Sequence, residues 1–375
     1  MIWSQLALPI ETMETYKTFK MDQVDINGGM TTKSDLKGSD KFFFTAYADV
    51  NIHENMIRDH SRTQTYREAI MASSHLLKGK VVADVGCGTG ILSCFCAKAG
   101  AKKVYAIDAS AIIEQAKLVV KENNLENIVE LVSGKAEDVQ LPEKVDVIVS
   151  EWMGNFLLFE AMLNSVVVAR DRFLKEGGLI LPSKCTLFVA PVDSQKIYER
   201  RIDFWSSTKE TYDLSMECMI PFAKKRIFGS VRREDVPSSE VVGKEQELAQ
   251  IDINTVTIED LDNVKGSFKM ACNKTTKLSG FTTWFDAYFE IKGKETVVLS
   301  TSPFATRTHW NQAVLYFDEP ISVKEGDVLD GSMLVTPALH NDRHLDIKLN
   351  YSIAGGKPAE RNYNTWKTPG PVEMY

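Results

Sequence analysis

Short apolar runs alternate with helix-type patterns between residues 80 and 181, and few folds accommodate such an alternation. Five runs predict strands, at 80–85, 103–108, 128–133, 145–150 and 179–181. Three segments predict helices, at 91–99, 112–123 and 160–173. Because buried parallel strands are apolar throughout and need helical crossovers, this favours an open, mostly parallel, doubly wound α/β sheet. We expect the last helix to end at Glu176-Gly177-Gly178, where glycine is typical of a C-cap.

Beyond Pro182 the pattern becomes that of a β domain. Strand-type runs occur at 186–192, 280–291, 297–301, 313–317 and 345–353. These runs indicate a second, all-β domain, a barrel or a sandwich. We therefore expect an α/β domain over 41–181 and a β domain over 182–375. Residues 1–40 are polar and are predicted to form a variable or mobile extension.

An insertion between two early strands of the β domain, at about 196–221, is rich in large apolar residues. They are Tyr198, Phe204, Trp205, Tyr212, Met216 and Met219. An exposed patch of this size is unfavourable on a monomer, which favours an interaction arm. A helical part of the local core is the alternative.

Composition narrows the class of protein. The net charge of −7 argues against a protein that coats nucleic acid and favours basic partners. The six cysteines have no CxxC or zinc-type spacing, so we expect reduced thiols, no metal and an intracellular protein, cytoplasmic or nuclear. We expect no signal peptide and no membrane span, because the N-terminal stretch lacks a basic region and no apolar run is long enough.

The segment Asp84 to Gly90 links the first predicted strand to the first predicted helix and carries glycines at 86, 88 and 90. Glycines there permit a tight turn and a close approach of the backbone to a ligand. The dinucleotide fingerprint places its third glycine one residue later, so the spacing differs from that motif.

Two further carboxylates follow neighbouring strands. Asp108 ends the second strand, where an acidic residue accepts hydrogen bonds from ribose hydroxyls in nucleotide-binding folds; a helix N-cap is the alternative. Glu137 follows the third strand and is placed to reach a purine amine. The combination resembles a nucleoside-binding site for S-adenosylmethionine, which has no pyrophosphate and needs no helix N-terminus. Arg62 is a candidate partner for the carboxylate of that cofactor.

The loop from Ser150 to Glu160 follows an apolar strand and has a glutamate at each end, Glu151 and Glu160. Two carboxylates close together in an apolar setting need a cation between them. The loop contains no Lys or Arg, so we expect the cation to be a ligand, and a planar guanidinium with five donors suits two carboxylates best. An ordinary solvated acidic loop is the alternative.

Three motifs together resemble the protein arginine methyltransferases of the type I subgroup. They are Asp84-Val-Gly-Cys-Gly-Thr-Gly90, Ser150-Glu-Trp-Met-Gly154 with Glu160, and Thr308-His309-Trp310. The resemblance runs from about Phe42 to near the C-terminus. It implies a helix lid, a Rossmann-like domain that binds S-adenosylmethionine, and a β-barrel with an inserted dimerisation arm that contacts the cofactor domain of a second copy.

The resemblance also implies roles for individual residues. Glu151 and Glu160 would grip the substrate guanidinium, and His309 would pair with Asp59. The cofactor would be bound by Phe44, His53, Arg62, Asp84, Gly86, Gly88, Asp108 and Glu137. The substrate pocket would include Tyr47, Met56, Met162 and Trp310. The substrates would be basic, arginine-containing proteins such as histones and Arg/Gly-rich proteins.

Three positions depart from the usual motifs. Phe43 replaces a tyrosine of the lid, Asn155 replaces an aromatic residue after Gly154, and Asp108 replaces a glutamate. The first two bear on substrate and product preference, and the third on cofactor affinity. None removes a charged catalytic group.

The implied reaction is an in-line attack of a guanidinium nitrogen on the sulfonium methyl group. Glu151 and Glu160 would localise the positive charge away from the attacking nitrogen and hold it in place. His309, oriented by Asp59, and Glu160 are both candidates for the base. Three other functions are considered: a catalytically weak subunit that activates another methyltransferase, a small-molecule methyltransferase, and a nicotinamide-dependent dehydrogenase, which would leave both glutamates unexplained.

Overall fold

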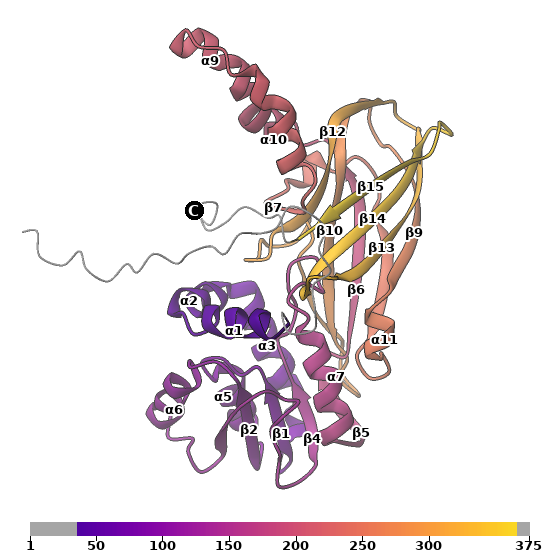
Figure 1. Ribbon diagram of the computed structural model, residues 1–375. Coiled ribbons are helices and arrows are strands. Elements are labelled where there is room, and N and C mark those ends of the chain that lie inside the picture. The colour runs from indigo at the N-terminus through magenta and orange to yellow at the C-terminus, as the bar shows by residue number, and fades with distance from the viewer. Residues whose placement is uncertain (1–35, 366–375) are drawn as a thin grey trace, which may run out of the picture. The chain divides into compact units, whose positions relative to one another are not determined.

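The structure is a computed structural model that describes residues 36–365. Residues 1–35, which contain most of the predicted N-terminal extension, and residues 366–375 lie outside this part of the chain. A region with a parallel sheet and helices is followed along the described chain by a region built mainly of antiparallel strands (Figure 1). No helix of residues 36–365 is both long and apolar enough to cross a membrane.

The first region contains a five-stranded parallel sheet of order β3-β2-β1-β4-β5. Its strands are β1 (Val81–Val85), β2 (Lys103–Asp108), β3 (Val129–Ser133), β4 (Val145–Val149) and β5 (Leu174–Leu181). The crossover helices are α5 (Ile91–Lys98), α6 (Ile113–Glu122) and α7 (Met162–Phe173). β1 is buried along its whole length, as expected of a central parallel strand. The predicted doubly wound α/β domain is confirmed.

The order of the strands reverses between β1 and β4, which are neighbours in the sheet. In open α/β sheets, ligands bind at the carboxyl ends of the strands at such a switch point. The glycine turn of residues 86–90 follows β1, and the loop that begins with Glu151 follows β4. The topology therefore brings the two most informative sequence segments to one edge of the sheet.

Four helices precede the sheet: α1 (Leu36–Ala46), α2 (Val50–Arg58), α3 (His60–Ala72) and α4 (Ser74–Leu77). Asp59 separates α2 from α3. It caps α3 by accepting a hydrogen bond from the N–H of Arg62 at 3.0 Å. Tyr66 of α3 is fully buried, and its hydroxyl donates to the carbonyl of Ser150 at the end of β4 (2.9 Å). These helices are thus fixed against the switch point.

The second region is built from two antiparallel sheets. One has the order β7-β12-β10-β6-β8, with β11 added to β10, and the other has the order β15-β14-β13-β9. The first comprises β6 (Lys184–Val192), β7 (Arg232–Glu234), β8 (Gln246–Asp252), β10 (Thr276–Phe289), β11 (Val297–Ser300) and β12 (Gln312–Val323). The second comprises β9 (Val264–Ala271), β13 (Val328–Ala338), β14 (Asn341–Ile353) and β15 (Ala359–Asn364), and α11 (Ile258–Leu261) precedes β9.

Aromatic side chains form the core shared by these two sheets. Phe281 of β10 lies 5.0 Å from Phe268 of β9, and Phe317 of β12 stacks on Tyr351 of β14 at 4.8 Å, measured between ring centres. The expected β-barrel domain is therefore present. The barrel strands missed by periodicity, such as β13 and β15, carry polar side chains on their exposed faces, which weakens the apolar signal.

One local prediction is wrong. The helix α7 ends at Phe173, and the residues up to Leu181 form strand β5, so Gly177 is not a helix C-cap. Gly177 has φ of +68° and lies where the register of β5 against β4 shifts, between the pairs Val145–Leu174 and Val147–Leu179. Glycine serves there to accommodate an irregularity within a strand.

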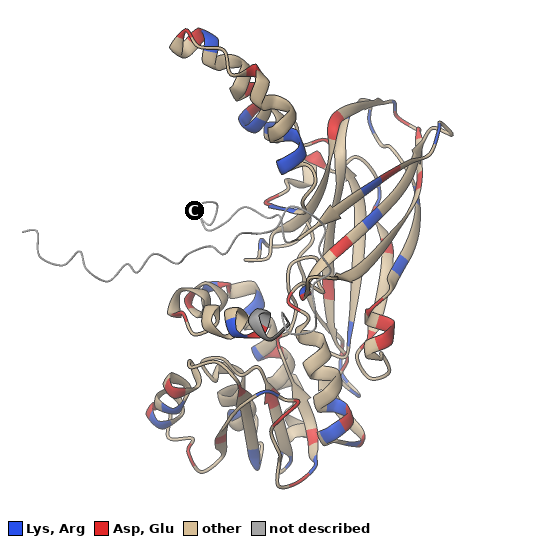
Figure 2. Ribbon diagram, in the orientation of Figure 1, with Lys and Arg blue, Asp and Glu red and all other residues tan. Residues whose placement is uncertain are grey.

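The insertion in the second region is a series of helices and helical turns between residues 196 and 227, longer than the predicted arm of about 196–221. It contains α8 (Lys196–Tyr198), a π turn (Glu199–Asp203), α9 (Phe204–Tyr212), a 3₁₀ turn (Glu217–Met219) and α10 (Ile220–Ile227). Figure 1 shows α9 and α10 extending away from the strands. Lys224, Lys225 and Arg226 give the last turn of α10 its basic character (Figure 2).

This helical segment, which we call the arm, combines both sequence interpretations. Ile202 and Ile227 are buried in a core shared with Phe228 and Tyr316, as a local helical subdomain requires. Towards its outer part, the side chains of Phe204, Tyr212 and Phe222 are 48%, 71% and 66% exposed. The base of the arm is therefore a packed structure, and its outer part presents apolar surface.

Candidate active site

The loop between Glu151 and Glu160, hereafter the double-Glu loop, has an unusual backbone. Phe156, Leu157, Glu160 and Ala161 all have positive φ, between +54° and +77°. Residues with a Cβ rarely adopt this conformation, and it persists only where the surroundings enforce it. A Cβ at Gly154 would lie 2.0 Å from the carbonyl oxygen of Phe159, so the two ends of the loop are in close contact. The loop is thus compact and strained, which is common at functional sites.

Glu151 has a cation from its own chain, contrary to the prediction that a ligand alone supplies the positive charge. Its carboxylate oxygen Oε2 accepts a hydrogen bond from Nε of Arg62 at 2.9 Å and forms an ion pair with Nη2 at 2.7 Å. Both side chains are 7% exposed. Arg62 is distant in sequence, on α3, which is why the composition of the loop did not show it. The pair satisfies the need of a buried charge for a partner.

Within residues 36–365, no cation bonds to the carboxylate of Glu160. The hydroxyl of Tyr47 donates to Oε2 of Glu160 at 2.6 Å. Burial raises the pKa of Glu160 to about 7, and the charge of Glu151 adds to this effect, whereas the Tyr47 hydrogen bond and Arg343 act in the opposite direction. Burial and the charge of Glu160 raise the pKa of Tyr47 in turn, so Tyr47 stays a proton donor.

The two carboxylates therefore retain capacity for a further donor. Among the described residues, Oε1 of Glu151 accepts one long bond, 3.2 Å from the N–H of Met153, and nothing donates to Oε1 of Glu160. With both glutamates ionised and Arg62 charged, these three residues carry a net charge of −1. One guanidinium would neutralise this charge, so the site suits a single cationic ligand. A freely solvated acidic loop is ruled out by the burial of Glu151.

The expected pairing of His309 with Asp59 is present. Nδ1 of His309 lies 2.7 Å from Oδ2 of Asp59, which also accepts a bond from the N–H of His309 at 2.7 Å. Burial opposes the charge of Asp59, but the bonds from His309 and from the N–H of Arg62 lower its pKa overall. Asp59 thus links the Thr308-His309-Trp310 segment to the start of α3, which carries Arg62.

Trp310 is placed differently from the predicted wall of the substrate pocket. It is 5% exposed, lies edge-on to Phe285 of the barrel core, and donates from Nε1 to the carbonyl of Met153 at 2.7 Å. Its indole ring is therefore occupied by core packing, and its N–H holds the double-Glu loop. Trp310 therefore stabilises the double-Glu loop from the side of the barrel core.

The glycine turn has the conformation that a close ligand approach requires. Gly86 and Gly88 have φ of +75° and +54°. A Cβ at Gly86 would lie 2.8 Å from Cε of Met162, and one at Gly88 would lie 3.1 Å from Cε1 of His53. Nε2 of His53 lies 2.8 Å from the carbonyl of Tyr47. Predicted cofactor residues and predicted substrate residues therefore share one neighbourhood.

Asp84 supports a ligand beside this turn. It is fully buried; Oδ2 accepts a bond from Ser93 at 2.6 Å, and within the described residues Oδ1 has no partner. Burial raises its pKa to about 7. A buried oxygen without a donor next to a positive-φ glycine turn fits a cofactor with an amino group, such as S-adenosylmethionine.

Of the other predicted cofactor residues, Asp108 contacts this turn directly, whereas Glu137 and Phe44 contact other parts of the chain. Asp108 accepts bonds from the N–H of Gly88 (2.8 Å) and from the N–H and hydroxyl of Ser110. It does not cap α6, which begins at Ile113, so the N-cap alternative is wrong. Glu137 is exposed and accepts a bond from Ser165 of α7 at 2.7 Å. Phe44 lies on α1, and the carbonyl of Met56 accepts a bond from Nη1 of Arg62 at 3.2 Å.

Some residues that shape the site were not found from the sequence. Tyr66 holds Ser150, and Arg343 of the barrel bonds to Glu160 and to Asp40 of α1. Arg343 and Tyr66 lie far from the double-Glu loop in sequence, and neither belongs to a motif with a known spacing. Only the charged turn around Asp342-Arg343 marks the first as a candidate, and such turns are usually solvated.

Comparisons with known proteins agree with this geometry. Residues 183–356 match the family model of the arginine methyltransferase oligomerization subdomain, and residues 59–183 match that of ribosomal protein L11 methyltransferase. The chain is 45% identical to protein arginine N-methyltransferase 6 of Danio rerio, over 88% of this chain and 95% of that protein. It is 43% identical to probable protein arginine N-methyltransferase 6 of Arabidopsis thaliana, over 84% and 80%.

Solved structures show the same similarity. The Trypanosoma brucei PRMT1 enzyme–prozyme heterotetrameric complex with AdoHcy superimposes with a TM-score of 0.79 at 34% identity, covering 85% of this chain and 99% of that chain. Arabidopsis thaliana protein arginine methyltransferase 10 gives a TM-score of 0.77 at 33% identity, over 86% and 99%. The chain belongs to the protein arginine N-methyltransferase family. The resemblance inferred from three motifs is thereby confirmed.

Proposed function

We propose that this protein transfers methyl groups from S-adenosylmethionine to guanidinium nitrogens of arginine residues in proteins. The observation that carries the proposal is the buried pair of Glu151 and Glu160, each with an oxygen open to a further donor, beside the glycine turn. Family membership supports it. A dehydrogenase would have no use for these two acids.

The cofactor, when bound, supplies an electrophilic methyl group on a sulfonium centre. Arg62 contacts Glu151 through Nε and Nη2, and it contacts the carbonyl and Sδ of Met56 through Nη1 and Nη2. These contacts leave one of its five N–H groups, on Nη1, which would donate to the carboxylate of the cofactor. Asp84 would receive the amino group of the cofactor at Oδ1, which has no partner among the described residues, and Asp108 fixes the glycine turn through Gly88.

The two glutamates orient the substrate. Hydrogen bonds from the guanidinium to Glu151 and Glu160 draw its positive charge towards two of its nitrogens and leave the third richer in electrons. They also hold that nitrogen in place, which replaces a bimolecular encounter by a local one. Tyr47 and Arg62 keep the acceptor oxygens in position, since both are themselves hydrogen-bonded to the carboxylates.

Two groups are suited to accept the proton that leaves the methylated nitrogen. Glu160 has a pKa raised to about 7, within the range of a base at neutral pH. His309 is oriented by Asp59 through Nδ1. Single-turnover experiments on His309→Ala at rising pH distinguish them. A basic medium should restore the rate if His309 is the base, whereas a rate that high pH does not restore leaves Glu160 as the base.

The test of the function uses the purified protein alone with labelled S-adenosylmethionine and an Arg/Gly-rich peptide. We expect methylarginine in the peptide, and we expect Glu151→Gln to abolish turnover while S-adenosylhomocysteine still binds. Full activity of this variant would refute the clamp. An inactive wild-type protein that stimulates another methyltransferase would instead identify an activating subunit, and binding of NADH in equilibrium dialysis would indicate a dehydrogenase.

We further propose type I chemistry, with asymmetric dimethylarginine as the final product, and basic substrates such as histone tails. The net charge of −7 and the acidic clamp support cationic partners. Free arginine should compete poorly with peptides if the substrate is a protein. Mass spectrometry of the methylated peptide separates asymmetric from symmetric and singly methylated products.

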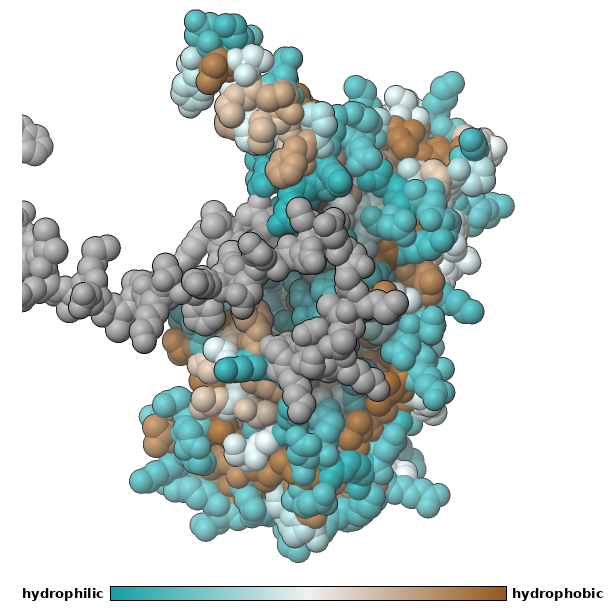
Figure 3. Space-filling model, viewed as in Figure 1, coloured by the Kyte–Doolittle hydropathy of each residue, from teal (hydrophilic) through white to brown (hydrophobic). Residues whose placement is uncertain are grey.

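The arm supports a homodimer. Its exposed apolar side chains include Phe204, Tyr212 and Phe222. Figure 3 shows hydrophobic patches on the arm, whose tip is mostly hydrophilic. Exposed apolar side chains on the first region, such as Val50 and Leu118, offer a surface of matching character on a second copy. Sedimentation analysis of Phe222→Asp tests this: we expect the wild type to sediment as a dimer and the variant as a monomer.

The cysteines support a reducing compartment, the cytoplasm or the nucleus. Cys87, Cys94, Cys96, Cys185 and Cys272 are buried free thiols, and Cys218 is exposed on the arm. Fractionation of cells that express the protein tests this assignment.

A further inference from the structure

Arg343 joins separate parts of the molecule that border the double-Glu loop. It lies near the start of β14, directly after the β13–β14 turn, and its side chain is 15% exposed. A largely buried arginine needs partners for its donors. Its partners lie on α1 on one side and at Glu160 on the other.

The contacts with α1 are ionic and aromatic. Nε and Nη2 of Arg343 donate to Oδ1 of Asp40, at 3.1 and 2.6 Å, and the guanidinium carbon lies 4.0 Å from the ring centre of Phe43. Lys135, which follows β3, pairs with the other oxygen of Asp40. Burial opposes the charge of Asp40, but the two cations lower its pKa overall. Helix α1 is thereby attached to both the barrel and the cofactor domain.

The contacts with Glu160 involve its backbone. Nη1 of Arg343 donates to the carbonyl of Glu160 at 2.7 Å, and the N–H of Glu160 donates to the carbonyl of Arg343 at 2.7 Å. Both polar backbone groups of Glu160 are therefore bound by one residue. Since Glu160 has φ of +77°, outside contacts of this kind keep it in a conformation that it would otherwise leave.

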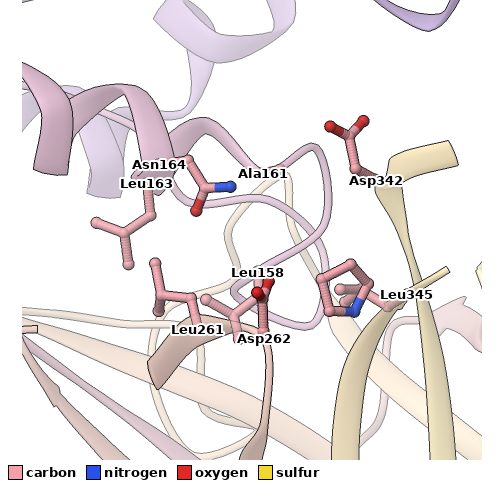
Figure 4. A pocket seen from close by; sticks show the side chains of 9 residues that line it. Leu158, Ala161, Leu163, Asn164, Leu261, Asp262, Asp342 and Leu345 are labelled. Carbon is pink, nitrogen blue, oxygen red and sulfur yellow. The ribbon is translucent and has the colours of Figure 1, made fainter. Parts of the chain in front are cut away.

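The packing next to this link is incomplete. Figure 4 shows a small pocket in which Asp342 and Leu345 of β14 lie across from Ala161 and Asn164. The barrel hairpin and the double-Glu loop thus leave a gap just beyond Glu160. The loop is held at this point by the Arg343 bonds and by the ring contact between Phe159 and His344, at 5.3 Å.

Helix α1 also positions Tyr47, which follows its last residue and donates a hydrogen bond to the carboxylate of Glu160. We propose that Arg343 is a positioning residue for the methyl transfer. It holds helix α1 next to the site and fixes the backbone conformation of Glu160, so that the ordering of α1 and the placement of Glu160 are coupled. This inference rests on the proposed role of Glu160 as substrate clamp. Arg343 bonds to the backbone of Glu160 and not to its carboxylate. Its effect on the reacting atoms is therefore indirect.

The first test measures hydrogen exchange of the full chain without cofactor, so it does not depend on activity. In Arg343→Ala we expect exchange to rise about tenfold or more in both α1 and residues 154–161. Asp40→Ala should raise it in α1 alone. Arg343→Lys keeps the charge near Asp40 but lacks the planar guanidinium that also reaches Glu160. Exchange should therefore stay slow in α1 and rise in residues 154–161.

Lys348→Ala is the matched control, because Lys348 lies on the same strand and forms an exposed ion pair with Glu360 at 2.8 Å. It should change neither segment. Unchanged exchange in Arg343→Ala would overturn the proposal. Equal exchange rates of residues 154–161 in Asp40→Ala and Arg343→Ala would also overturn it. An even rise of the exchange rate over the whole chain would do the same, because it would indicate a merely structural role.

The second test measures turnover of an arginine peptide at saturating cofactor and peptide. We expect kcat of Arg343→Ala to fall about a hundredfold, with a smaller loss in Asp40→Ala and none in Lys348→Ala. A loss confined to KM would overturn the positioning of Glu160. A wild-type protein that forms no methylarginine would refute the proposed function, and the exchange experiment would still decide on the link itself.

Discussion

The cofactor edge and the guanidinium clamp lie side by side but are built in different ways. The cofactor edge is local: Asp84, Gly86, Gly88 and Asp108 come from the neighbouring strands β1 and β2 and from the turn that joins β1 to α5. The clamp is assembled from distant segments, since Glu160 is held by Tyr47 and Arg343, and Glu151 by Arg62. A backbone conformation governs the first, and long-range side-chain contacts govern the second. Substitutions should therefore affect them separately.

The two glutamates of the clamp also differ from each other, in the partners of their carboxylates. Glu151 already has a cationic partner, whereas Glu160 has a neutral phenol and a pKa raised by burial to about 7. Only Glu160 gains a first cation at its carboxylate when a guanidinium enters. The electrostatic change on substrate binding should thus be concentrated at Glu160.

The largest effect is expected from removing that charge. Glu160→Gln should lower kcat about a hundred- to thousandfold, because one partner of a buried charge pair is lost, while the Kd of S-adenosylhomocysteine changes less than about threefold. Peptide turnover and calorimetry measure the two quantities. Glu176→Gln, an exposed acid on β5, is the control. A comparable loss of cofactor affinity would show that the two regions are not separate.

Removing the phenol of Tyr47 should have a smaller effect. Tyr47→Phe deletes a hydrogen bond to a carboxylate and should lower kcat/KM about ten- to hundredfold. Because this bond lowers the pKa of Glu160, its loss should also move the acidic limb of the pH–rate profile to higher pH. Tyr212→Phe on the exposed part of the arm serves for comparison. An acidic limb that stays in place would contradict the assignment.

The cofactor edge should respond to a backbone change. Gly86→Ala introduces a Cβ at φ of +75° and should weaken binding of S-adenosylhomocysteine about tenfold. Gly293→Ala has a similar φ of +79° in a barrel turn, with no atom within 4 Å of the added Cβ, so it imposes the same strain away from the site. Equal Kd values for both variants would show that the turn does not approach the cofactor.

The smallest expected signal is a fraction of a proton. Below pH 7 the raised pKa keeps Glu160 largely protonated, and a bound guanidinium lowers that pKa, so peptide binding should release protons near pH 6.5 and cease to do so well above pH 7. The groups facing this carboxylate are Tyr47, Glu151 and Arg343. Calorimetry in buffers of different ionisation enthalpy measures the release, and proton uptake would contradict the prediction.

Much of the fold was predictable because its signals are local. Buried parallel strands show as apolar runs, and glycine turns show as motifs, so β1, β2 and α5 lie close to their predicted bounds. The strands β13 and β15 have exposed polar faces and were missed. Gly177 was assigned to a helix end because a glycine in a bulged strand has the same local signature.

The sequence by itself determined that two acids bracket a loop after an apolar strand, that a glycine turn lies at the sheet edge, and which family these motifs indicate. The tertiary structure alone decided that Arg62 neutralises Glu151, that Trp310 supports the loop from the core, and that Arg343 holds Glu160. The reason is physical. A motif specifies the backbone within one turn or strand, whereas the partner of a buried charge is whichever side chain the packing of distant segments brings within a few ångströms.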